Sequence, residues 1–258
     1  MSQALVKGIQ LLEFVANGDD TLPKLTRSSG LPKSTIHRLA AVLVDNGLLR
    51  YQDHRYLLGY RLLELSEKAK RQLSYLQIAR PHLEELSRRT KETVHLGELS
   101  DGHIIYLDKI EGQRGLQMRS HIGLRTPAQL TALGKVLIAH RPRDEWDRHL
   151  LDLPARTPRT ITDREQLLQE LESVRQQGYA FDREENEPGT RCVAAPIWDS
   201  SGKVIAALSI SGATIYIDER RQMELAPVAI DFAQMISREL GGGEAASIPH
   251  RSDTSVPS

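Results

Sequence analysis

The sequence predicts an α+β protein with two domains, and three observations predict this class. Three helical patterns lie within the first 50 residues and are followed by two short runs of strand-forming residues. After residue 90 the pattern changes to pairs of strands separated by helical segments. The chain has 258 residues, of which 40% are hydrophobic, and this is enough for two packed cores.

The first two helices are expected before residue 30. Apolar side chains recur at helical spacing over residues 4–17, and Asn17-Gly18 is a typical stop. The face expected to be buried consists of Leu5, Ile9, Leu12 and Val15. A short second helix follows, with Thr21 as its expected cap and Leu25 pointing inward.

A third helix is expected over residues 33–46, with Gly47 as its stop. Its inward positions, at helical spacing, are Ile36, Leu39, Ala40 and Leu43. Because these positions are taken by the core, the face left outward near the start of the helix is basic and rich in hydroxyl groups. That face consists of Lys33, Ser34, Thr35, His37 and Arg38.

Residues 48–51 and 55–58 are strand-forming runs on either side of a polar turn, and they predict a hairpin. A helix, a short helix, a glycine-containing turn, a polar-faced helix and a hairpin, in this order, are typical of a winged helix-turn-helix. The residues after the hairpin, 59–90, have a helical pattern throughout.

This arrangement predicts how the chain would contact double-stranded operator DNA. In the major groove Arg38 is suited to guanine, while Ser34 and Thr35 are suited to phosphate. Arg50 and Arg55 in the hairpin would contact the flanking backbone or minor groove.

Composition limits the class of protein. Lys and Arg total 34, as do Asp and Glu, so attraction to DNA must come from a local patch rather than from net charge. The single cysteine, Cys192, rules out an intramolecular disulfide framework, and no Cys/His spacing indicates a zinc site. We expect no cofactor and no metal. The chain has no export signal and no run of about 18 apolar residues, which predicts a cytoplasmic protein without membrane contact.

The second half of the chain predicts strands and helices in one α+β domain. Two hairpins are expected, one from residues 93–99 with 103–110 and the other from residues 191–198 with 203–211. Helical patterns occupy residues 129–140, 143–151, 163–177 and 218–240.

The predicted domain organisation has four parts. A winged helix-turn-helix domain is expected at 1–60, a linker helix at 61–77 and the α+β domain at 78–240. Residues 241–258 have too little apolar content to pack, and we expect a disordered tail.

Several separated motifs resemble one family of bacterial regulators. Residues 30–39, GLPKSTIHRL, resemble the recognition segment of IclR-type transcription regulators. Residues 91–97 (KETVHLG), 132–135 (ALGK) and 184–196 (EENEPGTRCVAAP) resemble that family's effector domain, in the same order. The KETVHLG segment is similar to regulators of sugar-acid catabolism, such as the ketodeoxygluconate type. The resemblance covers residues 4–240.

The resemblance implies a GAF-like effector-binding domain with an antiparallel sheet flanked by helices. It also implies a homodimer joined through the DNA-binding domains, often assembled as a dimer of dimers. The implied effector-binding residues are Leu116, Met118, Ala132, Leu133, Asp182, Cys192, Ser209 and Ser211.

These residues suit a small carboxylate such as a sugar acid, because hydroxyl groups and backbone N–H groups at a helix start bind hydroxy and keto acids well. Asp182 fits an anionic ligand only if it bonds a hydroxyl group, since like charges repel at low dielectric. The chain is therefore expected to be a regulator, with repression favoured, whose operator binding a small carboxylate controls.

Other interpretations stay open. The apolar pocket residues would also suit an ordinary core, Cys192 a small buried hydrophobe, and the two serines hydrogen bonds to backbone. An enzyme would need Cys192 as nucleophile, with His95 or His121 as base and Asp182 orienting it, and nothing in the sequence places these together. A winged helix can also bind protein, which would make the chain an interaction module or assembly factor without specific DNA binding.

Overall fold

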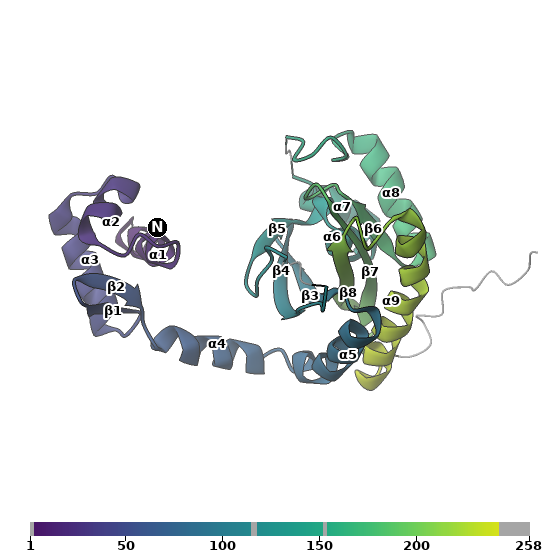
Figure 1. Cartoon of the computed structure of the whole chain (residues 1–258), viewed down its shortest axis with the longest axis horizontal. Helices are drawn as coiled ribbons and strands as arrows, with labels where there is room; N and C mark the ends of the chain where they lie inside the picture. The colour runs from purple at the N-terminus through teal and green to yellow at the C-terminus, as the bar shows by residue number, and fades with distance from the viewer. Residues whose placement is uncertain (1–2, 115–117, 152–153, 243–258) are drawn as a thin grey trace, which may run out of the picture. The chain divides into compact units, whose positions relative to one another are not determined.

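The computed structural model describes residues 3–114, 118–151 and 154–242, and these divide into two compact units between Ser74 and Tyr75. Each unit is described by itself (Figure 1). In these ranges no helix combines the length and the apolar composition needed to cross a membrane. The predicted disordered tail lies, from residue 243 on, outside the described residues.

The N-terminal unit has the predicted winged helix-turn-helix architecture. Its elements in order are α1 (Gln3–Ala16), α2 (Leu22–Ser29), α3 (Lys33–Asp45), β1 (Leu49–Gln52), β2 (Arg55–Leu58) and α4 (Arg61–Arg71). Both residues of the hairpin turn, Asp53 and His54, have positive φ, at 50° and 60°, as a two-residue type I′ turn requires. The core of the unit consists of Leu11, Val15, Leu25, Ile36, Ala40, Leu43, Leu49 and Tyr56.

The buried face of α1 differs from the predicted one. Leu5 is 65% exposed and Ile9 is 49% exposed, whereas Gly8, Leu11 and Val15 are buried. Apolar residues cover more than one stripe of this helix, and the stripe spaced i, i+3, i+7 is the one that is fully buried. Leu12 and Phe14 are half-buried against the same core, whereas Leu5, Val6 and Ile9 are exposed.

Two other local predictions hold only in part. Thr21 is the N-cap residue of α2, but its side chain makes no capping hydrogen bond, and its backbone carbonyl accepts the N–H of Leu25 instead. The helix predicted over residues 59–90 is interrupted after α4, where the Leu73 N–H bonds to the Lys70 carbonyl in a tighter turn. The apolar period continues through this break, and so the sequence pattern does not reveal it.

The C-terminal unit is built on an antiparallel sheet with the strand order β5-β4-β3-β8-β7-β6. The strands are β3 (Thr93–Ser100), β4 (His103–Ile110), β5 (Arg125–Pro127), β6 (Ala180–Arg183), β7 (Thr190–Trp198) and β8 (Val204–Ala213). β3 with β4 and β7 with β8 are the two predicted hairpins. β5 and β6 were not predicted, because strands of three or four residues carry too little alternation to be recognised.

Helices cover the sheet of the C-terminal unit (Figure 1). They are α5 (Tyr75–Thr90), α6 (Ala132–Ala139), α7 (Trp146–His149), α8 (Arg164–Gln177) and α9 (Glu219–Glu239), with short 3-10 turns η1 (Ala128–Leu130) and η2 (Arg143–Glu145). α6 packs on the face that carries Tyr106, Ala194 and Ala207, and α8 packs behind it. The unit is thus the predicted antiparallel sheet flanked by helices.

Candidate functional site

The start of α3 presents the polar face predicted to read DNA. Lys33, Ser34, His37 and Arg38 are exposed and Thr35 is half-buried. Within the part of the chain that the structure describes, the side chains of these residues form no hydrogen bond or ion pair. They are held in place from behind by the buried residues of the same helix, which leaves their polar groups free for a ligand.

The two wing arginines have partners inside the chain. Arg55 forms an ion pair with Asp20, at 2.8 Å. Arg50 donates to the hydroxyl group of Tyr60 at 2.9 Å, and its guanidinium lies 4.1 Å from the centre of that ring. Contact of either arginine with DNA would therefore compete with an existing interaction.

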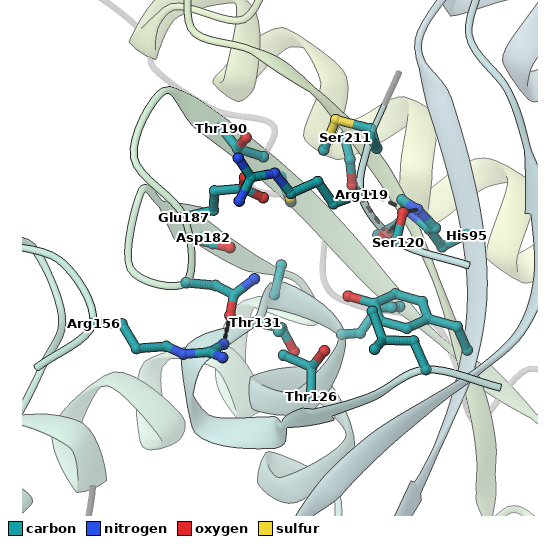
Figure 2. Close-up of a pocket in the computed structure, with 18 of the residues that line it drawn as sticks. His95, Arg119, Ser120, Thr126, Thr131, Arg156, Asp182, Glu187, Thr190 and Ser211 are labelled. Carbon is teal, nitrogen blue, oxygen red and sulfur yellow. Dashed lines mark hydrogen bonds and ion pairs between the residues drawn. The ribbon is translucent and has the colours of Figure 1, made fainter. Parts of the chain in front are cut away.

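A cavity of about 390 Å³ opens in the C-terminal unit, over the sheet face beside the N-terminus of α6 (Figure 2). Seven of the eight predicted effector residues line it, namely Met118, Ala132, Leu133, Asp182, Cys192, Ser209 and Ser211. The eighth, Leu116, lies outside the described residues. Segments that are about 90 residues apart in the sequence are brought together here.

Strand register explains why these side chains meet. Asp182 pairs with Cys192, and Cys192 pairs with Ser211, so the three lie in one row across β6, β7 and β8. Ser209 lies two residues from Ser211 on the same face, opposite His95 of β3. The polar floor of the cavity is thus formed by neighbouring rows of the sheet.

The N-terminus of α6 forms another wall. Thr131 caps the helix by accepting the Gly134 N–H at 3.0 Å, while Ala132 and Leu133 line the cavity. Their own N–H groups are at the first helical positions, where a helix offers no acceptor. A Cβ on Gly134 would lie 2.0 Å from the Ala128 carbonyl oxygen, and so only glycine permits this close approach of α6 to η1.

His95 is a neutral group at the back of the cavity. Burial, together with the smaller effect of the charge of Lys109, lowers its pKa to about 3. Its Nε2 lies 2.7 Å from the Ser120 hydroxyl, and its Nδ1 lies 3.4 Å from the hydroxyls of both Ser209 and Ser211. The imidazole therefore offers hydrogen bonds rather than charge.

Asp182 is the most deeply buried acid of the cavity, at 2% exposure. Burial, followed by the charge of Glu185, raises its pKa to about 7, against the opposing effects of Lys135 and of the backbone N–H groups of Glu185 and Asn186. One of its carboxylate oxygens accepts the Glu185 N–H at 2.7 Å. Near neutral pH this side chain is therefore divided between its charged and neutral forms.

Three exposed arginines line the cavity, namely Arg119, Arg125 and Arg156, and the first and last of them are labelled in Figure 2. Arg119 lies 3.5 Å from the carboxylate of Glu187, and Arg156 donates to Asn186 at 2.6 Å. Arg119 is 90% exposed, so the charges at the mouth are well solvated.

Comparisons with known proteins identify the family of a chain that combines the polar face of α3 with this cavity. A profile described as "IclR helix-turn-helix domain" matches residues 4–53, and one described as "Bacterial transcriptional regulator IclR C-terminal" matches residues 68–238. The chain belongs to the IclR family of transcriptional regulators.

Relatives of this IclR-family chain are similar along most of its length. It is 39% identical over 224 residues to the "HTH-type transcriptional regulator KdgR" of Escherichia coli K12, which covers 85% of each chain. The crystal structure of Thermotoga maritima IclR matches with a TM-score of 0.79 at 34% identity, covering 93% of this chain and 100% of that one.

A third comparison concerns ligand binding. An IclR homologue from Microbacterium hydrocarbonoxydans, solved in complex with 4-hydroxybenzoate, matches with a TM-score of 0.79 at 27% identity and covers 93% of this chain and 100% of that one. The ligand of that homologue is a small carboxylate.

Membership of the IclR family resolves the enzyme interpretation, because the family and the relatives are regulators. The chemistry agrees: burial and then the charge of Asp182 raise the pKa of Cys192 well above its usual range, which disfavours the thiolate a nucleophile needs. His121 does not line the cavity. Among the described residues, no group of three or more His, Cys, Asp and Glu side chains is arranged to hold a metal ion.

Sequence reasoning missed several polar residues of the IclR-type cavity. These include His95, Tyr106, Ser120, Thr126, Thr131, Arg156, Asn186 and Thr190. His95 carried a signal, since it is a polar residue between the apolar Val94 and Leu96 of a predicted strand. Arg156 and Ser120 lie in irregular segments, where no periodicity indicates the direction of a side chain.

Proposed function

We propose that this regulator represses transcription from an operator and that a small carboxylate, such as a sugar acid, controls its DNA binding from the cavity of the C-terminal unit. The observation that carries the proposal is the cavity itself, which combines hydroxyl groups, a helix N-terminus and arginines within about 390 Å³. That volume is in the range of pockets for small molecules. The homologue that binds 4-hydroxybenzoate supports the same ligand class.

The ligand carboxylate would be bound at the start of α6. The N–H groups of Ala132 and Leu133 carry the partial positive charge of a helix N-terminus, which favours anions. Ser209 and Ser211 would bond hydroxyl or keto groups of the ligand from the opposite wall. Met118 and Leu133 would contact its carbon chain.

DNA would be read by the exposed start of α3. Arg38 is suited to a base edge, while Lys33, Ser34 and Thr35 are suited to phosphate oxygens. His37 lies on the same face. Arg50 and Arg55 would contact the flanking backbone once released from Tyr60 and Asp20.

We further propose that the protein acts as a homodimer, with a dimer of dimers as the larger assembly. The exposed apolar side chains of the N-terminal unit support this proposal, because exposed patches of this kind mark interaction surfaces. They include Leu5, Val6 and Ile9 on α1 and Leu63 and Leu65 on α4. Light scattering on the purified protein tests the assembly state directly.

Ligand binding would reach the operator through the segment that joins the two units, α4 and residues 72–74. A tenfold change in DNA affinity requires that the ligand bind one state about 1.4 kcal/mol better than the other. We propose that the ligand changes the spacing of the two recognition helices in the dimer, so that they no longer match both half-sites.

The test is fluorescence anisotropy on DNA from upstream of the gene and its neighbours, against scrambled DNA, at near-physiological salt. The panel contains 2-keto-3-deoxygluconate, D-gluconate, D-galacturonate and 4-hydroxybenzoate, with D-glucose as a neutral control. Preference for the native DNA that one acid weakens supports the proposal. Preference that no acid changes in either direction contradicts control by a carboxylate.

A further inference from the structure

Two largely buried cations, Lys135 and Lys109, lie close to the inner wall of the cavity, and both are already paired, Lys109 with Glu111 at 2.8 Å. Lys135 of α6 is fully buried, and its ammonium lies 2.7 and 2.8 Å from the two carboxylate oxygens of Glu185 and 3.3 Å from Glu170. Glu170 also lies 3.7 Å from Arg183, so both cations of this cluster are already paired with Glu170 or Glu185. Asp182, next in space to Glu185, therefore has no cation of its own.

The groups that face Asp182 come from every element packed around it. Glu185 and Glu187 lie on the β6–β7 loop, Lys135 on α6, Cys192 on β7 and Tyr106 on β4. From α9, the neutral amide of Gln222 donates to the backbone carbonyl of Asp182. Among these groups the acids outnumber the single cation, and the environment disfavours a second buried negative charge.

Apart from the N–H groups at the start of α6, the rest of the buried wall, as far as the structure describes it, offers an anion no unpaired positive charge, since Lys109 is paired with Glu111. His95 is uncharged at neutral pH, and the remaining polar groups near it are the hydroxyls of Ser209, Ser211 and Ser120. The arginines lie at the solvated mouth, where Arg119 is 90% exposed. An anionic ligand that entered beside a charged Asp182 would experience strong repulsion at low dielectric.

We propose that Asp182 binds the effector as a neutral carboxylic acid, donating a hydrogen bond to the ligand's carboxylate, so that binding takes one proton from solvent wherever Asp182 is ionised in the free protein. The inference rests on the proposed function and adds the protonation state of Asp182 in which the cavity binds the effector. The only covalent bond formed is the O–H bond of Asp182, and the proton comes from water or buffer. Asp182 then fits an anionic ligand without needing a ligand hydroxyl group.

The sign of the pH effect follows from this linkage. In the free protein the Asp182 pKa of about 7 makes the side chain neutral in mild acid and charged in mild base. A bound carboxylate raises that pKa further, so affinity is constant well below pH 7 and weakens above it, by up to about tenfold per pH unit. Proton uptake per ligand rises over the same range from near zero toward one.

Isothermal titration calorimetry tests the proposal, with 2-keto-3-deoxygluconate and D-gluconate as probes. Titrations run from about pH 6 to about pH 8.5, in phosphate and in Tris, whose ionisation enthalpies differ, so that the number of protons taken up is measured directly on the unaltered protein. We expect the Kd to increase at least tenfold across this range and proton uptake to approach one.

Two variants make the assignment to Asp182 specific. Asp182→Asn keeps an oxygen that can accept the Glu185 N–H and an amide that donates to the ligand, so we expect binding with a flat pH profile and no proton uptake. Glu85→Gln removes a carboxylate of α5 that does not line the cavity and is paired with Arg88 at the surface, and it should leave the wild-type profile intact.

Each result decides between the hypotheses. Binding by wild type that is independent of pH, without proton uptake, overturns this inference and leaves the proposed function standing. A pH dependence that persists in folded Asp182→Asn also overturns it. Absence of binding by both acids at about pH 6, where Asp182 would be neutral, overturns the proposed sugar-acid effector together with this inference.

Discussion

The ammonium of Lys135 lies 2.7 Å from a carboxylate oxygen of Glu185, and the two side chains are 0% and 4% exposed. Glu185 follows β6, 50 residues from Lys135 on α6, and the pair connects the helix that walls the cavity to the loop that borders it. A buried ion pair is strongly destabilising when one partner is removed, because the other charge is left in a medium of low dielectric. This property makes the pair a sensitive probe of the C-terminal unit.

Lys135→Met should reduce the free energy of unfolding by about 3–5 kcal/mol, because Glu185 would lose its buried partner. Urea unfolding followed by circular dichroism measures the loss. Lys203→Met, at an exposed position in the β7–β8 turn, is the matched control and should stay within about 0.5 kcal/mol of wild type. Equal effects of the two variants would contradict the burial of Lys135.

Asp182→Asn should stabilise the folded protein at neutral pH but not in acid. The folded-state pKa of Asp182, about 7, lies above its ordinary value of 3.8. The free energy of unfolding of the wild-type protein is therefore highest below about pH 4 and decreases as pH rises toward 7, by at most about 1.4 kcal/mol per pH unit. Asparagine carries no charge, so the free energy of unfolding of the variant does not decrease for this reason. Urea unfolding at several pH values should show the two proteins diverging from about pH 4 and running parallel above about pH 7.5. Curves that stay parallel throughout would mean that Asp182 is not destabilised by burial.

Gly134→Ala should destabilise the C-terminal unit by at least about 2 kcal/mol, because the new Cβ would lie 2.0 Å from the Ala128 carbonyl oxygen. It should also weaken acid binding, since the start of α6 would have to shift away from η1. Gly8→Ala in α1, where nothing lies within 4 Å of the added carbon, is the control. Higher helix propensity should leave its stability unchanged or raised by up to about 1 kcal/mol in a thermal melt.

Arg38→Ala should cost about 1–3 kcal/mol in operator affinity and relax sequence preference at one position, if its guanidinium reads a base. Lys33→Ala should instead weaken binding to all DNA sequences alike and lower the salt dependence by about one counterion. Anisotropy titrations over a set of single-base operator variants distinguish the two. A uniform loss for Arg38→Ala would assign it to phosphate, and the exposed Arg88→Ala in the C-terminal unit should change neither property.

Much of the N-terminal unit is predictable from the sequence, because its elements are defined by local rules. The buried Ile36, Ala40 and Leu43 of α3 repeat at helical spacing, and this one stripe also determines which polar residues face outward. The prediction for α1 failed on Leu5 and Ile9, because a helix with apolar residues on two stripes does not specify which stripe its neighbours cover.

Less of the cavity than of the N-terminal unit is predictable from the sequence. The sequence by itself predicted the two long hairpins, a helix over residues 129–140 and, through the family resemblance, seven residues that line the cavity. Only the tertiary structure decided that Asp182 lies beside Glu185 while Lys135 is taken by Glu185 and Glu170, and therefore that its pKa is raised. Charge and burial depend on which distant segments meet, and a pattern that repeats every two or four residues carries no information about that.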